Sequence, residues 1–424
     1  MKVGIGRRFL SSFRGLKSGT SPDNHLRPPP ISQVSLQSLL ATATLPRCRK
    51  SLAIRTMTTL SKQMTAANSE FEQFFRYTSR RWLWDEEQQL QDRHRAFNVA
   101  RLQDLAAKAI GSGSCVSITN LAEGGFNKVF RPDMDDGKSV LTRIPNPNAG
   151  PSFHTTASEV ATMVFARDLL HIPVPRVLGW NATADNPAGS EYILMEAATG
   201  TQLSVVWDEL SPDSKLSIMR EVVAIESKML SLSFSHIYFA RDAVEGAVPA
   251  ELTNEAPSEL KERIRKTFSI GPTVDRDFWK RERASMEISR GPWSTSKDYA
   301  ISVGKRELEW IKNYAVANPP SDATLVSPAY HSPEAHLQLL EKYLRVALSL
   351  MDMEPILTRP TLWHRDLHSA NLFIDEGHIT SVIDWQGSWA GPLLLQAQPS
   401  PLVNYQGSIL LRRPENFDDL DSEQ

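Results

Sequence analysis

The residues best suited to chemistry form a short string near the carboxyl end of the sequence, His364-Arg365-Asp366-Leu367-His368-Ser369-Ala370-Asn371. A second acidic residue, Asp384, comes thirteen positions after Asn371 and ends an apolar run. Phosphoryl transfer to a hydroxyl uses one carboxylate to orient the attacking oxygen, an amide to hold Mg²⁺ and a second carboxylate to bridge that metal to the phosphates. The order and spacing of Asp366, Asn371 and Asp384 therefore predict kinase-type chemistry.

A glycine-rich turn lies far upstream, at Glu123-Gly124-Gly125-Phe126-Asn127. Glycines let the backbone approach phosphate oxygens and present N–H donors to them. The alternative is an ordinary hairpin turn. Because the turn precedes the other motifs in a kinase-like order, we favour phosphate binding for Gly124, Gly125, Phe126 and Asn127.

Two charged residues after this turn are candidates for holding a nucleotide. Arg143 lies in an apolar strand, where protein kinases carry their strand-three lysine, and its planar guanidinium can contact phosphate oxygens as a fork. Glu159, on the next predicted helix, could pair with Arg143. The alternatives are a surface arginine and an exposed helical glutamate, but the apolar neighbours of Arg143 favour phosphate binding.

A third candidate segment ends the apolar run Tyr192-Ile193-Leu194-Met195. In a kinase-like fold Met195, Glu196 and Ala197 would form the hinge whose backbone binds adenine. The alternative is a core strand that ends at a turn. The two interpretations are compatible, because a hinge would bind adenine through its backbone. We expect His364 to structure its loop. A structural role for His368 is at least as well supported as a contact with phosphate.

The surrounding pattern indicates which elements position these motifs. Apolar spacing predicts a helix over 98–109 and strands over 116–118, 128–130, 139–144 and 192–195. Ser211-Pro212 and Ser332-Pro333 are helix starts, each with a capping serine and a proline at the first helical position. The predicted inward faces of these two helices are Leu216, Met219, Val222, Val223 and Met229, and Leu337, Leu340, Leu344 and Ala347.

The first 65 residues differ in composition from the rest of the 424-residue chain. From Met1 to Met64 there are eleven lysines and arginines and a single acid, Asp23. Ile5, Phe9, Phe13 and Leu16 fall on one face of a possible helix. A cationic, amphipathic leader is typical of a mitochondrial transit peptide, with a disordered basic tail as the alternative.

Overall composition excludes several other classes of protein. The net charge of −2 gives no reason to expect a nucleic-acid partner, and no apolar run reaches the length of a membrane span. The two cysteines, Cys48 and Cys115, provide neither a disulfide framework nor a cysteine-based metal site. The oligomeric state cannot be read from the sequence.

Together these residues resemble the aminoglycoside phosphotransferase-like (choline-kinase-like) branch of the kinase superfamily. The resemblance runs from about Gly124 to Asp384. More narrowly, Gly291-Pro292-Trp293, Gly391-Pro392-Leu393 and the leader are similar to the fungal mitochondrial members named for altered inheritance of mitochondria. The resemblance implies an α+β, two-lobed, protein-kinase-like fold with a small antiparallel sheet lobe and a mainly helical lobe. It also implies the cofactors ATP and Mg²⁺ and a small-molecule hydroxyl substrate.

The resemblance assigns a role to each motif. Asp366 would be the catalytic base, and Asn371 and Asp384 would bind Mg²⁺. Gly124 to Asn127 would cover the phosphates, and Met195 to Ala197 would line adenine. We expect a leader over 1–65, a nucleotide-binding lobe over 66–200 and a helical lobe over 201–424, in a protein of the mitochondrial matrix. Because 40 residues follow Asp384, whereas family members continue with further helices, we expect this helical lobe to be short.

Three hypotheses compete for the function. The leading one is an ATP- and Mg²⁺-dependent phosphotransferase that acts on a hydroxyl of an unknown small molecule. The second is a nucleotide-binding pseudokinase that serves as a mitochondrial scaffold, which the short helical lobe and Arg143 favour. A protein kinase is disfavoured because Asp384-Trp385-Gln386 replaces D-F-G and no A-P-E follows. Tryptophans 207, 279, 293 and 310 fit core packing better than a cage for a cationic substrate.

Overall fold

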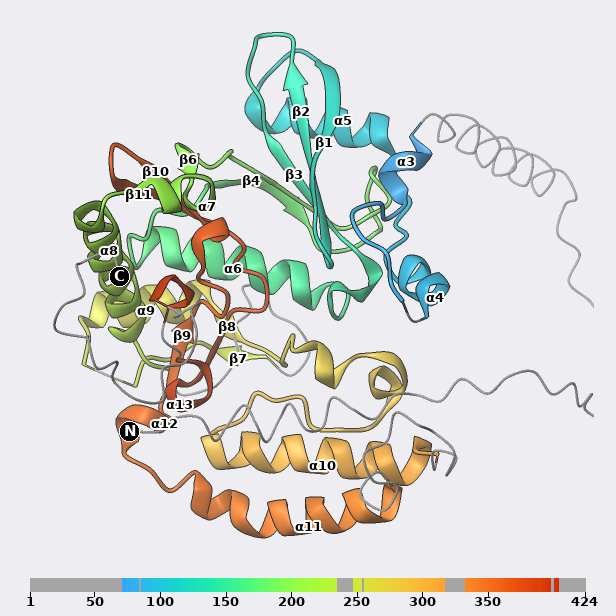
Figure 1. Ribbon diagram of the computed structural model, residues 1–424, viewed down its shortest axis with the longest axis vertical. Helices are drawn as coiled ribbons and strands as arrows, with labels where there is room; N and C mark the ends of the chain where they lie inside the picture. The colour runs from blue at the N-terminus through green and yellow to red at the C-terminus, as the bar shows by residue number, and fades with distance from the viewer. Residues whose placement is uncertain are drawn as a thin grey trace, which may run out of the picture.

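The computed structural model describes residues 71–83, 85–234, 247–253, 255–316, 332–397 and 400–403. The predicted leader helix and the acidic end of the chain lie outside these residues. A small sheet and helix α5 stand at one end of the protein, and helices α10 and α11 at the other (Figure 1).

The strands are β1 (Cys115–Glu123), β2 (Asn127–Met134), β3 (Leu141–Pro145), β4 (Val177–Asn181), β5 (Tyr192–Met195), β6 (Thr201–Gln202), β7 (Val248–Pro249), β8 (Ser269–Ile270), β9 (Pro360–Trp363), β10 (Leu372–Asp375), β11 (His378–Val382) and β12 (Trp389–Pro392). The longer helices are α5 (Val99–Ile110), α6 (His154–Asp168), α8 (Pro212–Leu230), α9 (Ser258–Thr267), α10 (Ser296–Tyr314) and α11 (Pro333–Leu350). The short ones are α3 (Glu72–Phe75), α4 (Glu86–Gln91), α7 (Leu203–Val206), α12 (Pro355–Thr358), α13 (Leu393–Gln396) and the 3₁₀ turns η2 (Pro147–Ala149), η3 (Trp207–Glu209), η4 (Arg276–Phe278), η5 (Arg281–Ser285), η7 (Ser369–Asn371) and η8 (Pro401–Val403).

The main sheet is antiparallel, with the strand order β1-β2-β3-β5-β4. The glycine-rich turn joins β1 to β2, and an acidic turn with Gly137 at φ 81° precedes β3. Strand β5 shows how the sheet is buried, since successive side chains of a strand point to opposite faces. Tyr192 and Leu194 pack in a cluster with α3 and α5, whereas Ile193 and Met195 pack in a larger cluster with α6 and α8. The predicted α+β arrangement, a small antiparallel sheet followed by a mainly helical region, is confirmed.

Helix α8 begins where Ser211-Pro212 predicted, and the Ser211 hydroxyl accepts the N–H of Ser214 at 3.2 Å. The predicted inward face was partly wrong, because Leu216 and Val223 are 50% and 54% exposed. The buried stripe is instead Ile218, Val222, Ile225 and Met229. Spacings of four, three and four residues keep this stripe on one face, and Leu216 and Val223 fall outside it.

Helix α11 starts at the predicted Ser332 cap, and its Leu340 and Ala347 are buried. Its neighbour is α10, which carries buried Trp310. Among the described helices, none combines the length and apolar character needed to cross a membrane.

The chemistry-bearing string lies between two short strands. Strand β9 pairs with β12, and β10 pairs with both β11 and β6. Leu362, Leu372 and Val382 anchor these strands in the larger core cluster. The pairing of β6 with β10 brings the segment after β5 directly against the strand that follows the His364–Asn371 string. It depends on Gly200, whose φ is 87° and where a Cβ atom would lie 2.3 Å from the carbonyl oxygen of Ile374.

Candidate active site

Residues 364–371 form a loop that we call the catalytic loop because it carries the candidate base, and the ring of His364, which is 2% exposed, anchors it. The Nε2–H donates to the carbonyl oxygen of Ile383 at 2.9 Å, and Nδ1 accepts the backbone N–H of Asp366 at 3.3 Å. Both bonds form only on a neutral ring with its proton on Nε2. Burial lowers the pKa of His364 and so favours this neutral form. The geometry is that of a structural residue, as the sequence predicted.

Asp366 extends from this anchored loop into solvent, and its side chain is 66% exposed. Nδ2 of Asn371 donates to the Asp366 backbone carbonyl at 2.9 Å, which ties the two residues together. His368 caps η7 by accepting the N–H of Ala370 on Nδ1, and its Nε2 lies 3.5 Å from Oδ2 of Asp366. His368 is therefore structural through one nitrogen and faces the candidate base with the other.

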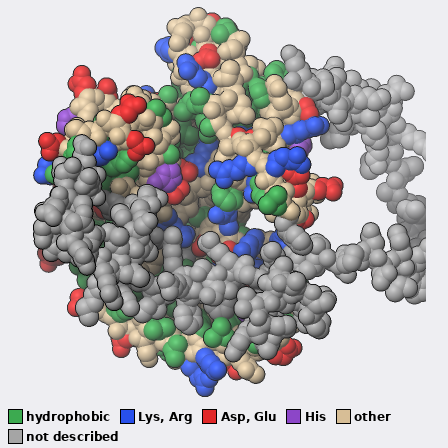
Figure 2. Space-filling model, viewed as in Figure 1, with side chains coloured by type: hydrophobic (Ala, Val, Ile, Leu, Met, Phe, Trp, Pro, Cys, Tyr) green, Lys and Arg blue, Asp and Glu red, His purple; other side chains and the backbone are tan. Residues whose placement is uncertain are grey.

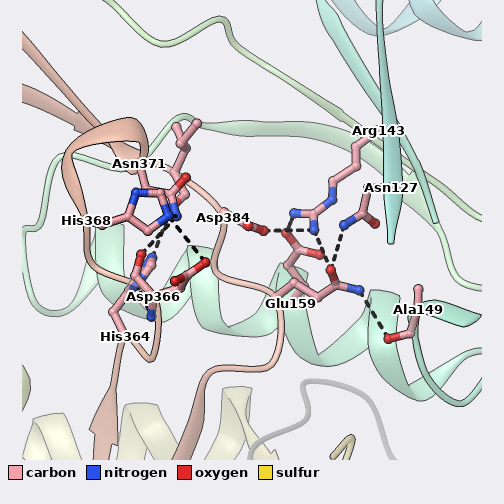
Figure 3. A network of polar contacts seen from close by, with 11 residues as sticks. Asn127, Arg143, Ala149, Glu159, His364, Asp366, His368, Asn371 and Asp384 are labelled. Atoms are coloured by element: carbon pink, nitrogen blue, oxygen red, sulfur yellow. Dashed lines mark hydrogen bonds and ion pairs between the residues drawn. The ribbon is translucent and has the colours of Figure 1, made fainter. Parts of the chain in front are cut away.

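Asp384 lies between the catalytic loop and the sheet (Figure 3). Its backbone has φ 62°, a left-handed conformation that costs a non-glycine residue about 1 kcal/mol. Its carboxylate remains 42% exposed, and Oδ1 lies 3.0 Å from Nη2 of Arg143. The backbone N–H of Ile383 donates to the carbonyl oxygen of Asn371 at 3.0 Å, so the two segments that carry Asn371 and Asp384 are adjacent.

Arg143 is 6% exposed and forms an ion pair with Glu159 of α6, which is 4% exposed. The sequence analysis had proposed this pairing. Burial raises the pKa of Glu159 to about 7; the Arg143 charge opposes this shift and Asp384 adds to it. The Arg143 guanidinium thus links Glu159 on the helix with Asp384 beside the catalytic loop.

The glycine-rich turn is braced by the chain segment that precedes α5. The Glu123 carboxylate accepts hydrogen bonds from the N–H groups of Thr78 and Ser79 at 2.7 and 3.0 Å. It also pairs with Lys128, which is fully buried, at 3.1 Å. Lys128 Nζ donates to the carbonyl oxygens of Phe74 and Arg76. Burial lowers the pKa of Lys128, against the opposing effect of Glu123.

Two further contacts hold the tip of the turn. Arg93 donates from Nε to the carbonyl oxygen of Gly125 at 3.1 Å. Arg276 of η4 lies 3.4 Å from the centroid of the Phe126 ring. A Cβ atom at Gly125 would meet nothing within 4 Å, so the backbone there is open to a ligand. The turn therefore has an accessible tip on a fixed base.

The predicted hinge follows β5. Met195 is buried, Glu196 is half-buried and Ala197 is exposed. The Glu196 carboxylate accepts the N–H and Nε–H of Arg176 at 3.1 and 3.0 Å, so this side chain is committed to structure. Any contact of Glu196 with a nucleotide would use its backbone. Figure 2 shows the face of the protein hollowed near its centre, with basic and acidic side chains on the walls of the hollow.

The residues predicted to bind Mg²⁺ supply the oxygen donors that this ion prefers. The Asn371 side chain donates through Nδ2 to the carbonyl oxygen of Asp366, so Oδ1 is the atom suited to a cation. Asp384 offers a half-exposed carboxylate. Within the described residues no cluster of three histidine, cysteine or acidic side chains forms a complete metal cage. Two protein ligands are typical of a Mg²⁺ site, because this ion completes its coordination shell with waters and phosphate oxygens.

Sequence reasoning missed two functional candidates. Gln386 contacts both Asn127 and Arg143, although it had been noted only as a departure from D-F-G. Its position two residues after Asp384 was the available signal. Lys128 was taken as part of an ordinary strand, because nothing in the local pattern marks a lysine as buried.

Comparisons with known proteins agree with the motifs. The model of the phosphotransferase enzyme family matches residues 302–395. A subtelomeric hrmA-associated cluster protein of Aspergillus fumigatus is 35% identical over 317 residues, covering 67% of this chain and 60% of the relative. Altered inheritance of mitochondria protein 9 of Yarrowia lipolytica is 27% identical over 385 residues, covering 83% of this chain and 64% of the relative. The chain thus spans about three fifths of the length of these relatives.

Solved structures with similarity to this chain include the aminoglycoside phosphotransferase APH(4)-Ia, at 14% identity and a TM-score of 0.38 over 69% of this chain and 73% of that one. A fructosamine-3-kinase homologue from Thermobifida fusca aligns at 15% identity and a TM-score of 0.37, over 69% and 75% of the two chains. The resemblance to aminoglycoside phosphotransferase-like proteins, and to the altered inheritance of mitochondria subgroup, is confirmed by the family match and the curated relatives.

Proposed function

Because this chain resembles the phosphotransferase enzyme family and the altered inheritance of mitochondria proteins, we propose that it is an ATP- and Mg²⁺-dependent phosphotransferase acting on a hydroxyl of a small molecule. The observation that carries the proposal is the contact between Arg143 and Asp384. It places the candidate phosphate-binding cation beside the candidate metal-binding carboxylate, on the segment next to Asp366 and Asn371.

In the proposed phosphoryl transfer, each of the site residues has a separate role. Asp366 accepts the hydroxyl proton while the hydroxyl oxygen bonds to the terminal phosphorus of ATP. The bond from that phosphorus to the ADP oxygen breaks, and ADP leaves with its electron pair. Gly124 to Asn127 and Arg143 hold the phosphates, and the backbone of Met195 to Ala197 holds adenine. Mg²⁺ at Asn371 and Asp384 would neutralise charge on the phosphates.

We propose the same domain division as the sequence indicated: a leader over 1–65, a nucleotide-binding lobe over 66–200 and a helical lobe over 201–424. The basic leader and the mitochondrial names of the relatives support import into mitochondria. Microscopy of the full chain fused to a fluorescent protein, with and without residues 1–65, tests this location.

The central experiment measures Mg–ATP binding by calorimetry and ADP release with a library of small-molecule alcohols. Asp366→Asn should lower turnover by about 10²- to 10⁴-fold while nucleotide affinity changes little. Asp352→Asn is the matched control, because its side chain is 81% exposed and, among the residues that the structure describes, forms an ion pair only with Lys297, at 3.5 Å. A full chain that binds no nucleotide would refute the proposal, whereas nucleotide binding without transfer to any acceptor would favour the pseudokinase scaffold.

A further inference from the structure

The side chain of Gln386 contacts three separate segments of the chain, at Asn127, Arg143 and Ala149. Its Oε1 accepts the Nδ2–H of Asn127 at 2.6 Å and the Nη2–H of Arg143 at 2.8 Å. Its Nε2 lies 3.5 Å from the carbonyl oxygen of Ala149, just before α6. A carboxamide accepts hydrogen bonds through its oxygen and donates through its nitrogen, so the three contacts match the chemistry of glutamine.

The backbone at Gln386 is also held in place by its neighbours. The neighbouring Trp385 is 1% exposed, and its Nε1–H donates to the carbonyl oxygen of Val382 at 3.0 Å. The residues on either side of this pair, Asp384 and Gly387, both have left-handed backbones, with φ 62° and 70°. The peptide is therefore held in a tight bend that places the carboxylate of Asp384 and the amide of Gln386 in contact with the same guanidinium.

We infer that Gln386 is a positioning residue that couples the phosphate-binding turn to the metal-binding carboxylate. The inference deepens the proposed function and rests on it. Asn127 ends the turn, and Asp384 would bind the metal. Gln386 contacts the turn directly, at Asn127, and is linked to Asp384 through Arg143, which contacts both side chains. A nucleotide that orders the turn thereby also orders Asp384, so Mg²⁺ and nucleotide bind with positive cooperativity, each raising the affinity of the other by the same factor.

The test is a coupling measurement on the full chain. The dissociation constant of a non-hydrolysable ATP analogue is measured by calorimetry in EDTA and at increasing Mg²⁺, and the ratio gives the coupling factor. Gln386→Leu removes all three contacts at similar volume and should reduce the factor about tenfold, with only a small change in the affinity measured in EDTA. Gln386→Glu keeps an acceptor for Asn127 and Arg143 and should retain most of the coupling.

A matched control separates coupling from general stability. Gln396 is buried and donates to the carbonyl oxygens of Thr361 and Gly391, remote from the turn. Gln396→Leu should lower the melting temperature but leave the coupling factor unchanged. If Gln386→Leu does not fold, Asn127→Ala removes one donor of the same link and should lower the factor too. An unchanged factor in the folded variant overturns the inference alone, whereas wild-type protein that binds no nucleotide overturns the proposed function and the inference with it.

Discussion

The Nη2 atom of Arg143 lies 3.0 Å from Oδ1 of Asp384, although 241 positions separate the two residues in the chain. The first comes from the middle of the sheet, and the second follows β11 beside the catalytic loop. Because Arg143 is also paired with Glu159, the charge on Glu159 affects how firmly the guanidinium is held against Asp384. The protonation state of Glu159 thus affects the contact between Arg143 and Asp384.

The first prediction concerns this glutamate. The pKa of Glu159 is about 7 in the folded protein against an ordinary value of 4.5, so the folded state retains this proton where the unfolded state has lost it. The contribution of Glu159 to the free energy of unfolding is therefore full below pH 4.5 and declines as the pH rises to about 7. It declines by up to about 3 kcal/mol in total.

Urea denaturation of wild type and Glu159→Gln at several pH values isolates this contribution as the difference between the two curves. Hydrogen bonds from Lys266 and Arg265 lower the pKa of Glu262 on helix α9, so its titration lies below this range and Glu262→Gln should leave the curve between pH 4.5 and 7 as it is in the wild type. Parallel curves for wild type and Glu159→Gln between pH 4.5 and 7 would show that the shift is absent.

The second prediction concerns the anchor of the catalytic loop. His364→Leu leaves the carbonyl of Ile383 and the N–H of Asp366 without their partner in a partly buried site. We expect a loss of about 2–4 kcal/mol in the free energy of unfolding. Turnover should fall at least tenfold, because Asp366 loses its orientation, while the KM for ATP changes little. A larger change in KM than in kcat would mean that His364 acts mainly on the nucleotide side.

The third prediction tests the brace of the glycine-rich turn. Glu123→Gln leaves the Lys128 charge buried without its carboxylate and should cost about 3–5 kcal/mol. Glu123→Gln combined with Lys128→Met should cost less than the sum of the single changes, because the unpaired charge is gone. Arg131→Met breaks an exposed pair with Asp133 and should cost less than about 1 kcal/mol. Strict additivity in the double variant would argue against a buried ion pair.

The fourth prediction compares two glycines with similar backbones. Gly137 has φ 81° and open space around it, whereas a Cβ atom at Gly200 would strike the carbonyl of Ile374. Gly137→Ala should therefore cost only the left-handed conformation, about 1–2 kcal/mol. Gly200→Ala should cost about 2–4 kcal/mol, since it adds a steric conflict between the hinge and β10. Equal denaturation midpoints for the two variants would show that the β6–β10 contact relaxes freely.

Local signals predicted the elements and the central residues of this site. Asp366, Asn371 and Asp384 were visible because they lie within one short stretch with a recognisable spacing. Arg143 and Glu159 were found because a strand and a helix placed them in a known order. Gln386 was missed because its role depends on Asn127, which is 259 positions away. Lys128 was missed because its carbonyl acceptors, at Phe74 and Arg76, lie 54 and 52 positions upstream. On α8, the list of apolar residues did not decide which of them face inward.

The brace under the glycine-rich turn also sets a practical boundary for anyone who trims this protein for crystallisation. A fragment that begins at α5 would contain every strand of the main sheet, yet it would lack the carbonyl groups of Phe74 and Arg76 that bind Lys128. It would also lack Thr78, Ser79 and Arg93, which hold Glu123 and Gly125. The smallest useful fragment therefore includes α3, well before the first strand.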